Sequence, residues 1–208
     1  MLIAEQLMLL CIDPKSGDFD ASRSHADANL LCAAALILDL FEQRRLRYQG
    51  KHLVIEPLLP TTHPQLAAAA QILAGPVGGL PASAAVELLV GRLNPTSFNL
   101  LESLFRRDVL HRVRESWLPW SKLHFPLRSI QARNEASTQL RNAAVADHGS
   151  LRGMGLLMLT DLAGQLEHNL IGDTHEAAMS RLLRLRGSRS VVDAEHDLLV
   201  DLRDALMA

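Results

Sequence analysis

The chain has 208 residues, of which 48% are hydrophobic and 21% are charged, and its formal net charge at pH 7 is −2. This composition excludes an intrinsically disordered chain, and the small negative charge excludes a general attraction to nucleic acid. Leu and Ala dominate while β-branched and aromatic residues are scarce, so the chain is predicted to be mainly α. One continuous core suffices at this length, and we expect a single domain over residues 1–208.

The N-terminal quarter predicts two helices and a hairpin. Apolar residues at helical spacing predict a short helix over residues 2–12, and DPKSGD ends it. A long helix over 26–43 is apolar nearly all round, which is typical of a buried central helix. The apolar period changes to about two over residues 45–56, which predicts a β-hairpin around Gly50.

The middle of the chain predicts three more helices and a second hairpin. Two helices are expected over 64–74 and 82–91, separated by GPVGGLP. The next begins at NPTSF, where we expect Asn94 as the N-cap and Pro95 at the first helical position. Residues 109–125 then form two apolar arms around SWLPWS, which predicts a hairpin with this tip.

After Pro126 the pattern is helical to the end of the chain. We expect four pieces, at roughly 128–147, 150–170, 173–187 and 190–207. The predicted fold is therefore a helical bundle around a buried central helix, with two small β-hairpins.

The sequence lacks the common motifs for metal binding, nucleophilic catalysis and nucleotide binding. The nine histidines form no HExxH pair and no cluster with cysteine, and there is no GxSxG, Walker or GxGxxG motif. Asp39 and Asp161, both in core helices, are interpreted as hydrogen-bonded helix residues and not as an acid–base pair. We therefore expect neither an enzyme nor a metal or cofactor site.

Two further features of the sequence bear on where in the cell the protein is located. Cys11 and Cys32 lie inside apolar runs, which predicts buried, reduced thiols and a cytosolic protein without disulfides. The longest apolar run, 30–38, has about half the length that a bilayer span requires.

Both tryptophans of the chain lie in RESWLPWSK, residues 114–122. At a hairpin tip, Trp117, Leu118 and Trp120 would form an exposed apolar wedge, and tryptophan favours the membrane interface. The alternative is that the tip folds back and its rings pack on the bundle, because aromatic residues are usually buried. The residues alone leave both interpretations open.

Basic residues surround this hairpin. Residues 106–128 contain six basic and two acidic side chains, a local formal charge of +4 that suits anionic lipid. A single small apolar insertion binds a membrane weakly, so a headgroup pocket or oligomerisation would supply a second signal. The predicted headgroup patch consists of Arg106, Arg107, Arg112, Arg114 and Lys122.

The order of these segments resembles the Golgi phosphoprotein 3 family. The segments that carry the resemblance are AEQLMLLCIDPKSGDF, LLCAAALILDLFEQRRLRY, DVLHRVRESWLPWSKLHFPLRS, SLRGMGLLMLTDLAGQLEHNL and HEAAMSRLLRLRG. The resemblance implies a mostly helical fold and peripheral membrane association, with a hydrophobic hairpin that dips into the bilayer and supports oligomers. Eukaryotic members bind phosphatidylinositol 4-phosphate and capture cytosolic tails of membrane enzymes, which implies an adaptor role.

The family's headgroup residues are not matched in this chain. A gapless alignment places Ser24 and Ala33 at the positions of a tryptophan and an arginine of the family, and the family's pair of arginines has no counterpart among Asn94 to Ser97. Recognition of phosphatidylinositol 4-phosphate itself is therefore left open. Residues that could supply a substitute pocket are Arg23, Arg44, Arg106 and Arg107.

Taken together, the sequence predicts a peripheral membrane protein that binds anionic phospholipid on the cytosolic face of a membrane. Its expected partners are that membrane, tails of membrane enzymes and further copies of itself, but not nucleic acid. The alternative is a soluble interaction module in which the Trp117 and Trp120 hairpin contacts a protein, since tryptophan is equally suited to a protein interface.

Overall fold

The computed structural model describes residues 1–19, 24–56, 61–118, 121–146, 149–187 and 193–208. These residues form ten helices and two antiparallel two-stranded sheets, so the prediction of a mainly α fold is confirmed. The helices are α1 (Ile3–Cys11), α2 (Ala28–Glu42), α3 (Pro64–Leu73), α4 (Ala82–Leu93), α5 (Thr96–Arg106), α6 (Ile130–Val145), α7 (Leu151–Leu162), α8 (Leu166–Asn169), α9 (Asp173–Gly187) and α10 (Ala194–Met207). The strands are β1 (Leu46–Gln49), β2 (His52–Ile55), β3 (Val113–Arg114) and β4 (Leu123–His124).

Helix α2 lies at the centre of the molecule, as its apolar sequence predicts. Every residue from Leu31 to Leu40 is buried, and the helix contacts α1, α3, α4, α5, α7 and α10. Asp27 caps its start, because the side chain accepts a hydrogen bond from the N–H of Asn29 at 2.7 Å. A helix this apolar is stable only because other helices surround it.

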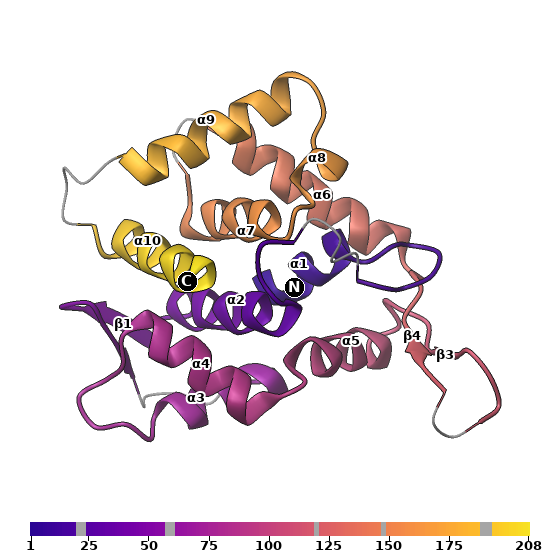
Figure 1. Cartoon of the computed structure of the whole chain (residues 1–208), viewed down its shortest axis with the longest axis horizontal. Helices are drawn as coiled ribbons and strands as arrows, with labels where there is room; N and C mark the ends of the chain where they lie inside the picture. The colour runs from indigo at the N-terminus through magenta and orange to yellow at the C-terminus, as the bar shows by residue number, and fades with distance from the viewer. Residues whose placement is uncertain (20–23, 57–60, 119–120, 147–148, 188–192) are drawn as a thin grey trace.

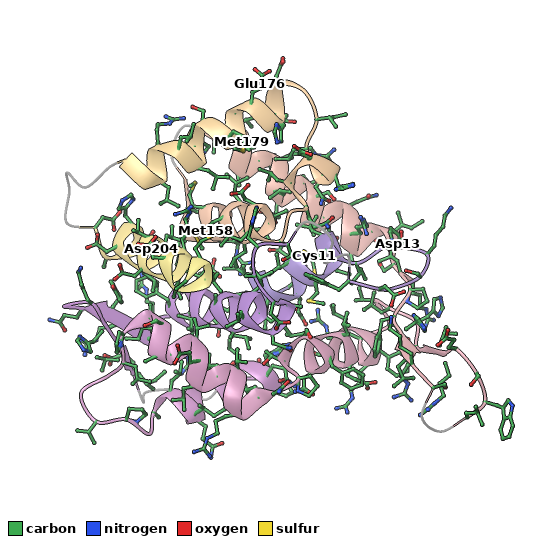
Figure 2. The ribbon with its side chains drawn as sticks, in the orientation of Figure 1. Cys11, Asp13, Met158, Glu176, Met179 and Asp204 are labelled. Carbon is green, nitrogen blue, oxygen red and sulfur yellow. The ribbon has the colours of Figure 1, made fainter. Side chains whose placement is uncertain are left out.

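Helix α1 is equally enclosed, with all nine of its residues buried. It contacts α2, α5, α6 and α7, so the first element of the chain belongs to the middle of the core. In Figure 1, α6 to α9 lie on one side of the α1–α2 pair and α3 to α5 on the other. Cys11 and Met158 point into this interior, whereas Asp13 and Glu176 lie on the outside (Figure 2).

The two cysteines behave as predicted. Both are free and buried, and Cys32 Sγ lies 3.3 Å from the sulfur of Met8. Burial raises the pKa of the Cys11 thiol to about 12, so this side chain stays neutral and inert.

Strands β1 and β2 form the predicted first hairpin, with Leu46 opposite Ile55 and Gln49 opposite His52. Tyr48 of β1 donates a hydrogen bond to Asp201, which ties the hairpin to α10. Strands β3 and β4 form the second hairpin, with Val113 opposite His124.

The structure corrects two predicted details. Asn94 is not the N-cap of α5, because α4 continues to Leu93 and Asn94 is the extended residue that follows it. The Oδ1 atom of Asn29 in α2 accepts from the N–H of Ser97 instead, at 3.0 Å. The helix predicted over 150–170 is also interrupted, since Gly164 with φ 67° turns the chain between α7 and α8.

Candidate membrane-contact site

The second hairpin extends from the end of α5 and projects away from the helices (Figure 1). Its stem is paired at Leu110–Leu127, at the two strand pairs of β3 and β4, and by a hydrogen bond from the N–H of Glu115 to the carbonyl of Lys122 at 3.1 Å. The predicted hairpin over 109–125 is therefore present, although its strands are only two residues long. Short strands fit an arm that packs on no other sheet.

The tip presents a tryptophan to the outside. Trp117 is 89% exposed, so its ring lies free of the bundle and has no core to enter. Leu118 is half-buried, and its N–H donates to Ser116 Oγ at 3.3 Å within the turn. Trp120 lies outside the described residues. For Trp117 the interpretation in which the ring folds back onto the bundle is therefore wrong.

A loop from the N-terminal part of the chain supports the base of the hairpin. Its residues 13–19 follow α1, and the carbonyl of Pro14 accepts from the N–H of Leu127 at 2.9 Å. Asp18 binds Lys122 Nζ at 2.6 Å and His124 Nδ1 at 3.2 Å, and the bond from Lys122 lowers the pKa of Asp18. Below this contact, the ring of Phe125 is buried edge-on against Phe98, with centroids 5.6 Å apart. The stem is thus anchored in the core.

The five predicted headgroup residues do not form one continuous patch. Arg106, Arg107 and Arg112 line a groove of about 670 Å³ between α3 and α5, which we name the α3–α5 groove. Arg114 lies in β3 and Lys122 lies directly before β4, and neither residue lines this groove. Leu123 of the stem also lines the groove, so groove and hairpin adjoin.

Carboxylates from elsewhere in the chain face these basic residues. Glu5 binds Arg107 at 2.5 Å, Glu102 binds Arg112 at 3.1 Å, and Asp18 holds Lys122. None of these three acids belongs to residues 106–128, so the local charge of +4 falls to +1 once they are included. The net positive charge of this region is therefore smaller than the sequence alone predicts.

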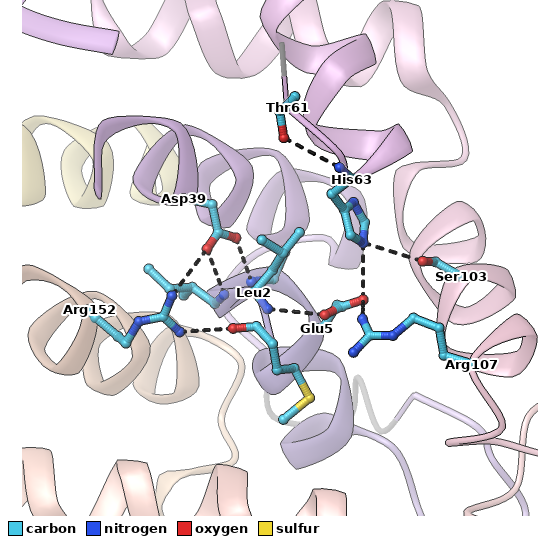
Figure 3. Close-up of polar contacts among 11 residues, drawn as sticks. Leu2, Glu5, Asp39, Thr61, His63, Ser103, Arg107 and Arg152 are labelled. Carbon is cyan, nitrogen blue, oxygen red and sulfur yellow. Dashed lines mark hydrogen bonds and ion pairs between the residues drawn. The ribbon is translucent and has the colours of Figure 1, made fainter. Parts of the chain in front are cut away.

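A buried polar network connects the groove to the N-terminus of α1 (Figure 3). Glu5 Oε1 is bound by Arg107 and by His63 Nε2, the latter at 3.1 Å, while Oε2 accepts from the N–H of Leu2 at 3.0 Å. Burial alone would raise the pKa of Glu5, but the hydrogen bonds from His63, Leu2 and Arg107 outweigh it and lower this pKa to about 2. Glu5 is therefore a fixed negative charge beneath the groove.

Asp39 is the second acid of this network. Its carboxylate accepts from the N–H groups of Ile3 and Ala4 at 2.8 and 3.1 Å, and Arg152 Nη2 lies 3.9 Å away. The expectation of a hydrogen-bonded helix residue is confirmed for Asp39, which caps α1 from within α2. Asp161 lines a different pocket, with His25 and His175.

Comparison with models of protein families matches residues 3–206 to the Golgi phosphoprotein 3 (GPP34) model. The chain belongs to the Golgi phosphoprotein 3 family. The resemblance inferred from the segment order is thus confirmed over nearly the whole chain. A search of the curated proteins finds no match. Among the residues that the structure describes, no helix is both long and apolar enough to cross a bilayer.

Ser24 and Ala33, on which a tryptophan and an arginine of the family fall, do not line the α3–α5 groove. Ala33 is fully buried within α2, and the hydroxyl of Ser24 donates to the carbonyl of Ala26 at 2.6 Å. Ser97 is bound to Asn29. Arg44 lines another groove with Leu151 and Glu195, and Arg23 lies outside the described residues. The substitute pocket suggested by the sequence is therefore reduced to Arg106 and Arg107.

Sequence reasoning missed the residues that α3 contributes to this groove. His63 precedes Pro64, the first residue of α3, and both line the groove with Gln65. The signal was present, since Pro at the first helical position marks a helix start and His63 is not among the residues that cap one well. Only the fold shows that this helix start faces α5.

Proposed function

We propose that this protein is a peripheral membrane protein that binds anionic phospholipid. It inserts the hairpin tip into the membrane interface and attracts lipid headgroups through the neighbouring basic residues. On this proposal it acts by binding and not by catalysis, needs no cofactor, and lies on the cytosolic face of a membrane. Membership of the Golgi phosphoprotein 3 family supports this proposal. The family also leads us to propose that the protein is an adaptor for tails of membrane enzymes and that it self-associates at the membrane.

The observation that carries the proposal is the exposed indole ring of Trp117. Single exposed apolar side chains are ordinary on a protein surface, and Val77 and Ile171 are examples here. A tryptophan is different, because its large apolar ring and single N–H donor suit the boundary between headgroups and hydrocarbon. This ring also stands at the end of an arm whose base is buried in the core. An anchored arm with an apolar tip suits shallow insertion.

Charge supports the same orientation. Arg112, Arg114 and Lys122 flank the tip in the sequence, and each exposed cation near an anionic leaflet contributes about 1 kcal/mol. Neighbouring carboxylates reduce the total free energy of this charge attraction. Ring insertion and charge attraction must therefore act together. Stable attachment requires two such signals.

Sedimentation with liposomes tests the proposal. The native chain is compared with Trp117→Ala on neutral vesicles and on anionic vesicles, the latter with and without phosphatidylinositol 4-phosphate. We expect binding to anionic vesicles that falls about tenfold or more in the variant, because the ring's transfer free energy is lost. Dependence on the phosphoinositide would identify the preferred headgroup.

The matched control is Ile171→Ala, which removes an apolar side chain that is 82% exposed between α8 and α9. This variant should sediment with vesicles as the native chain does. If the native chain bound no vesicle of any composition, the membrane proposal would be wrong. The hairpin would then be assigned to a protein contact, and light scattering would report whether Trp117→Ala changes the oligomeric state.

A further inference from the structure

The α3–α5 groove has the properties of an anion site, and we propose that it binds a phosphate monoester. This inference rests on the proposed function, since it names the headgroup chemistry that the basic residues near the hairpin would recognise. The ligand could be the terminal phosphate of a lipid headgroup or a free phosphate ester, because both present the same group. Ser24 and Ala33, on which two of the family's headgroup residues fall, are not among the residues that line this groove.

Three guanidinium groups with donors to spare line one side of the groove. Arg106 is exposed and forms no ion pair with any residue that the structure describes. Arg107 is 46% exposed and uses only Nη1 on Glu5, so its other N–H groups remain available. Arg112 lies 4.7 Å above the ring of Phe105, which fixes the plane of its guanidinium. Arginine binds phosphate oxygens in pairs through such planar forks.

The start of α3 lines the opposite side. This helix has ten residues, and its N-cap residue His63 makes no capping hydrogen bond with its side chain. Pro64 has no N–H, and no group in the described chain accepts from the N–H of Gln65. Free N–H groups and the helix dipole favour a negative ligand at this end. The arginines therefore face a second source of positive potential.

Short polar side chains complete the lining between these two sides. The hydroxyl of Ser103 lies 3.4 Å from His63 Nε2 and can donate to a phosphate oxygen. Figure 3 shows Ser103 and Arg107 on the same side of the Glu5–His63 pair. A phosphate monoester has three terminal oxygens, which matches donors that converge from α3, from α5 and from the residues before the hairpin.

Two carboxylates oppose the three arginines. Glu5 is 1% exposed beneath Arg107, and Glu102 is 16% exposed beside Arg112. The groove therefore has a formal charge of +1, and a bound phosphate would compete with Glu102 for Arg112. This competition makes a prediction of opposite sign for two neighbouring residues: loss of Arg106 weakens phosphate binding, and loss of the Glu102 charge strengthens it.

Calorimetric titration of the full chain with glycerol 3-phosphate tests the site in solution. Arg106→Gln should weaken binding about tenfold, because a charge-assisted hydrogen bond is lost. Glu102→Gln should strengthen it about threefold, because a competing charge is removed. Arg128→Gln is the matched control, since Arg128 is 51% exposed and lies outside the groove. No saturable binding, or equal effects of Arg106→Gln and Arg128→Gln, would overturn the proposal.

Vesicles then distinguish the two sources of phosphate. Phosphatidic acid presents a monoester and phosphatidylglycerol a diester, and the two are compared at equal surface charge. Preference for phosphatidic acid that Arg106→Gln removes would assign a lipid headgroup, whereas dependence on Arg106 in the calorimetry alone would assign a free phosphate ester. Trp117→Ala should bind glycerol 3-phosphate like the native chain, so a failure of hairpin insertion would leave this result unchanged.

Discussion

Asp39 is a carboxylate inside the core whose hydrogen-bond partners are backbone groups of another helix. Burial raises its pKa to about 7, although the N–H groups of Ile3 and Ala4 and the charge of Arg152 act in the opposite direction. In the unfolded chain the same group titrates near 3.8. A folded-state pKa above the unfolded one means that this acid contributes most stability at low pH and loses that contribution as pH rises toward 7.

The first prediction concerns Asp39→Asn. The amide keeps an acceptor for one backbone N–H but cannot ionise, so the variant escapes the cost of a buried charge. Its free energy of unfolding relative to the native chain should improve as pH rises from about 4 to about 8. Urea unfolding of both proteins at the two pH values measures the difference. A relative decline over this range would mean that the backbone N–H groups and Arg152 keep Asp39 ionised.

Among the elements, the loop between α1 and α2 does more than connect helices. Its sequence DPKSGD predicts only a break, yet the loop holds the hairpin stem through Pro14 and Asp18. Gly17 has φ 74°, and a Cβ atom at this position would overlap the backbone of Phe125 and Pro126. The close approach of loop and stem therefore depends on a residue without a side chain.

The second prediction compares Gly17→Ala with Gly50→Ala. Both glycines have positive φ, but a Cβ atom on Gly50 meets nothing within 4 Å. Gly50→Ala should cost about 1 kcal/mol of stability from backbone strain alone. Gly17→Ala should cost clearly more, because the loop must also separate from the stem. Thermal unfolding measures both, and equal losses would contradict the proposed contact.

Local sequence patterns predicted the helices and strands well, but they predicted poorly which elements contact one another. The periods of α1, α2 and the first hairpin appear in the sequence because apolar side chains must face a core. The capping of α5 by Asn29 cannot be seen in the sequence, because the two segments come together only in the fold. The same limit applies to the candidate site: the tip was predictable from its tryptophans, whereas the part that α3 plays in the groove was not.

At the scale of the whole molecule, charges far apart in sequence become neighbours. Glu5 and Asp18 lie about a hundred residues from Arg107 and Lys122, yet each forms an ion pair with one of them. A charge count along a segment cannot include such partners. On the proposed function, we therefore predict only a moderate electrostatic attraction to a membrane, with the apolar tip contributing a large share of the binding.

The third prediction follows from this balance. Binding to anionic vesicles should weaken as ionic strength rises from about 0.05 to about 0.5 M, because exposed charges are screened beyond about 4 Å at the higher value. Binding should level off at high salt and not vanish, since ring insertion remains. Flotation assays with native chain and Trp117→Ala measure both parts. Vesicle binding that did not change with salt would contradict this balance, because it would mean that the basic side chains contribute nothing to the attraction.

The enclosure of α1 has a consequence for the order of events in synthesis. Helices α6 and α7, which contact α1 in the core, are synthesised more than a hundred residues after it. Its nine residues, mostly apolar, have no complete site to occupy until then. Such a segment is exposed to aggregation and is a natural substrate for chaperones during translation. The site for α1 is thus complete only after segments far along the chain have been synthesised.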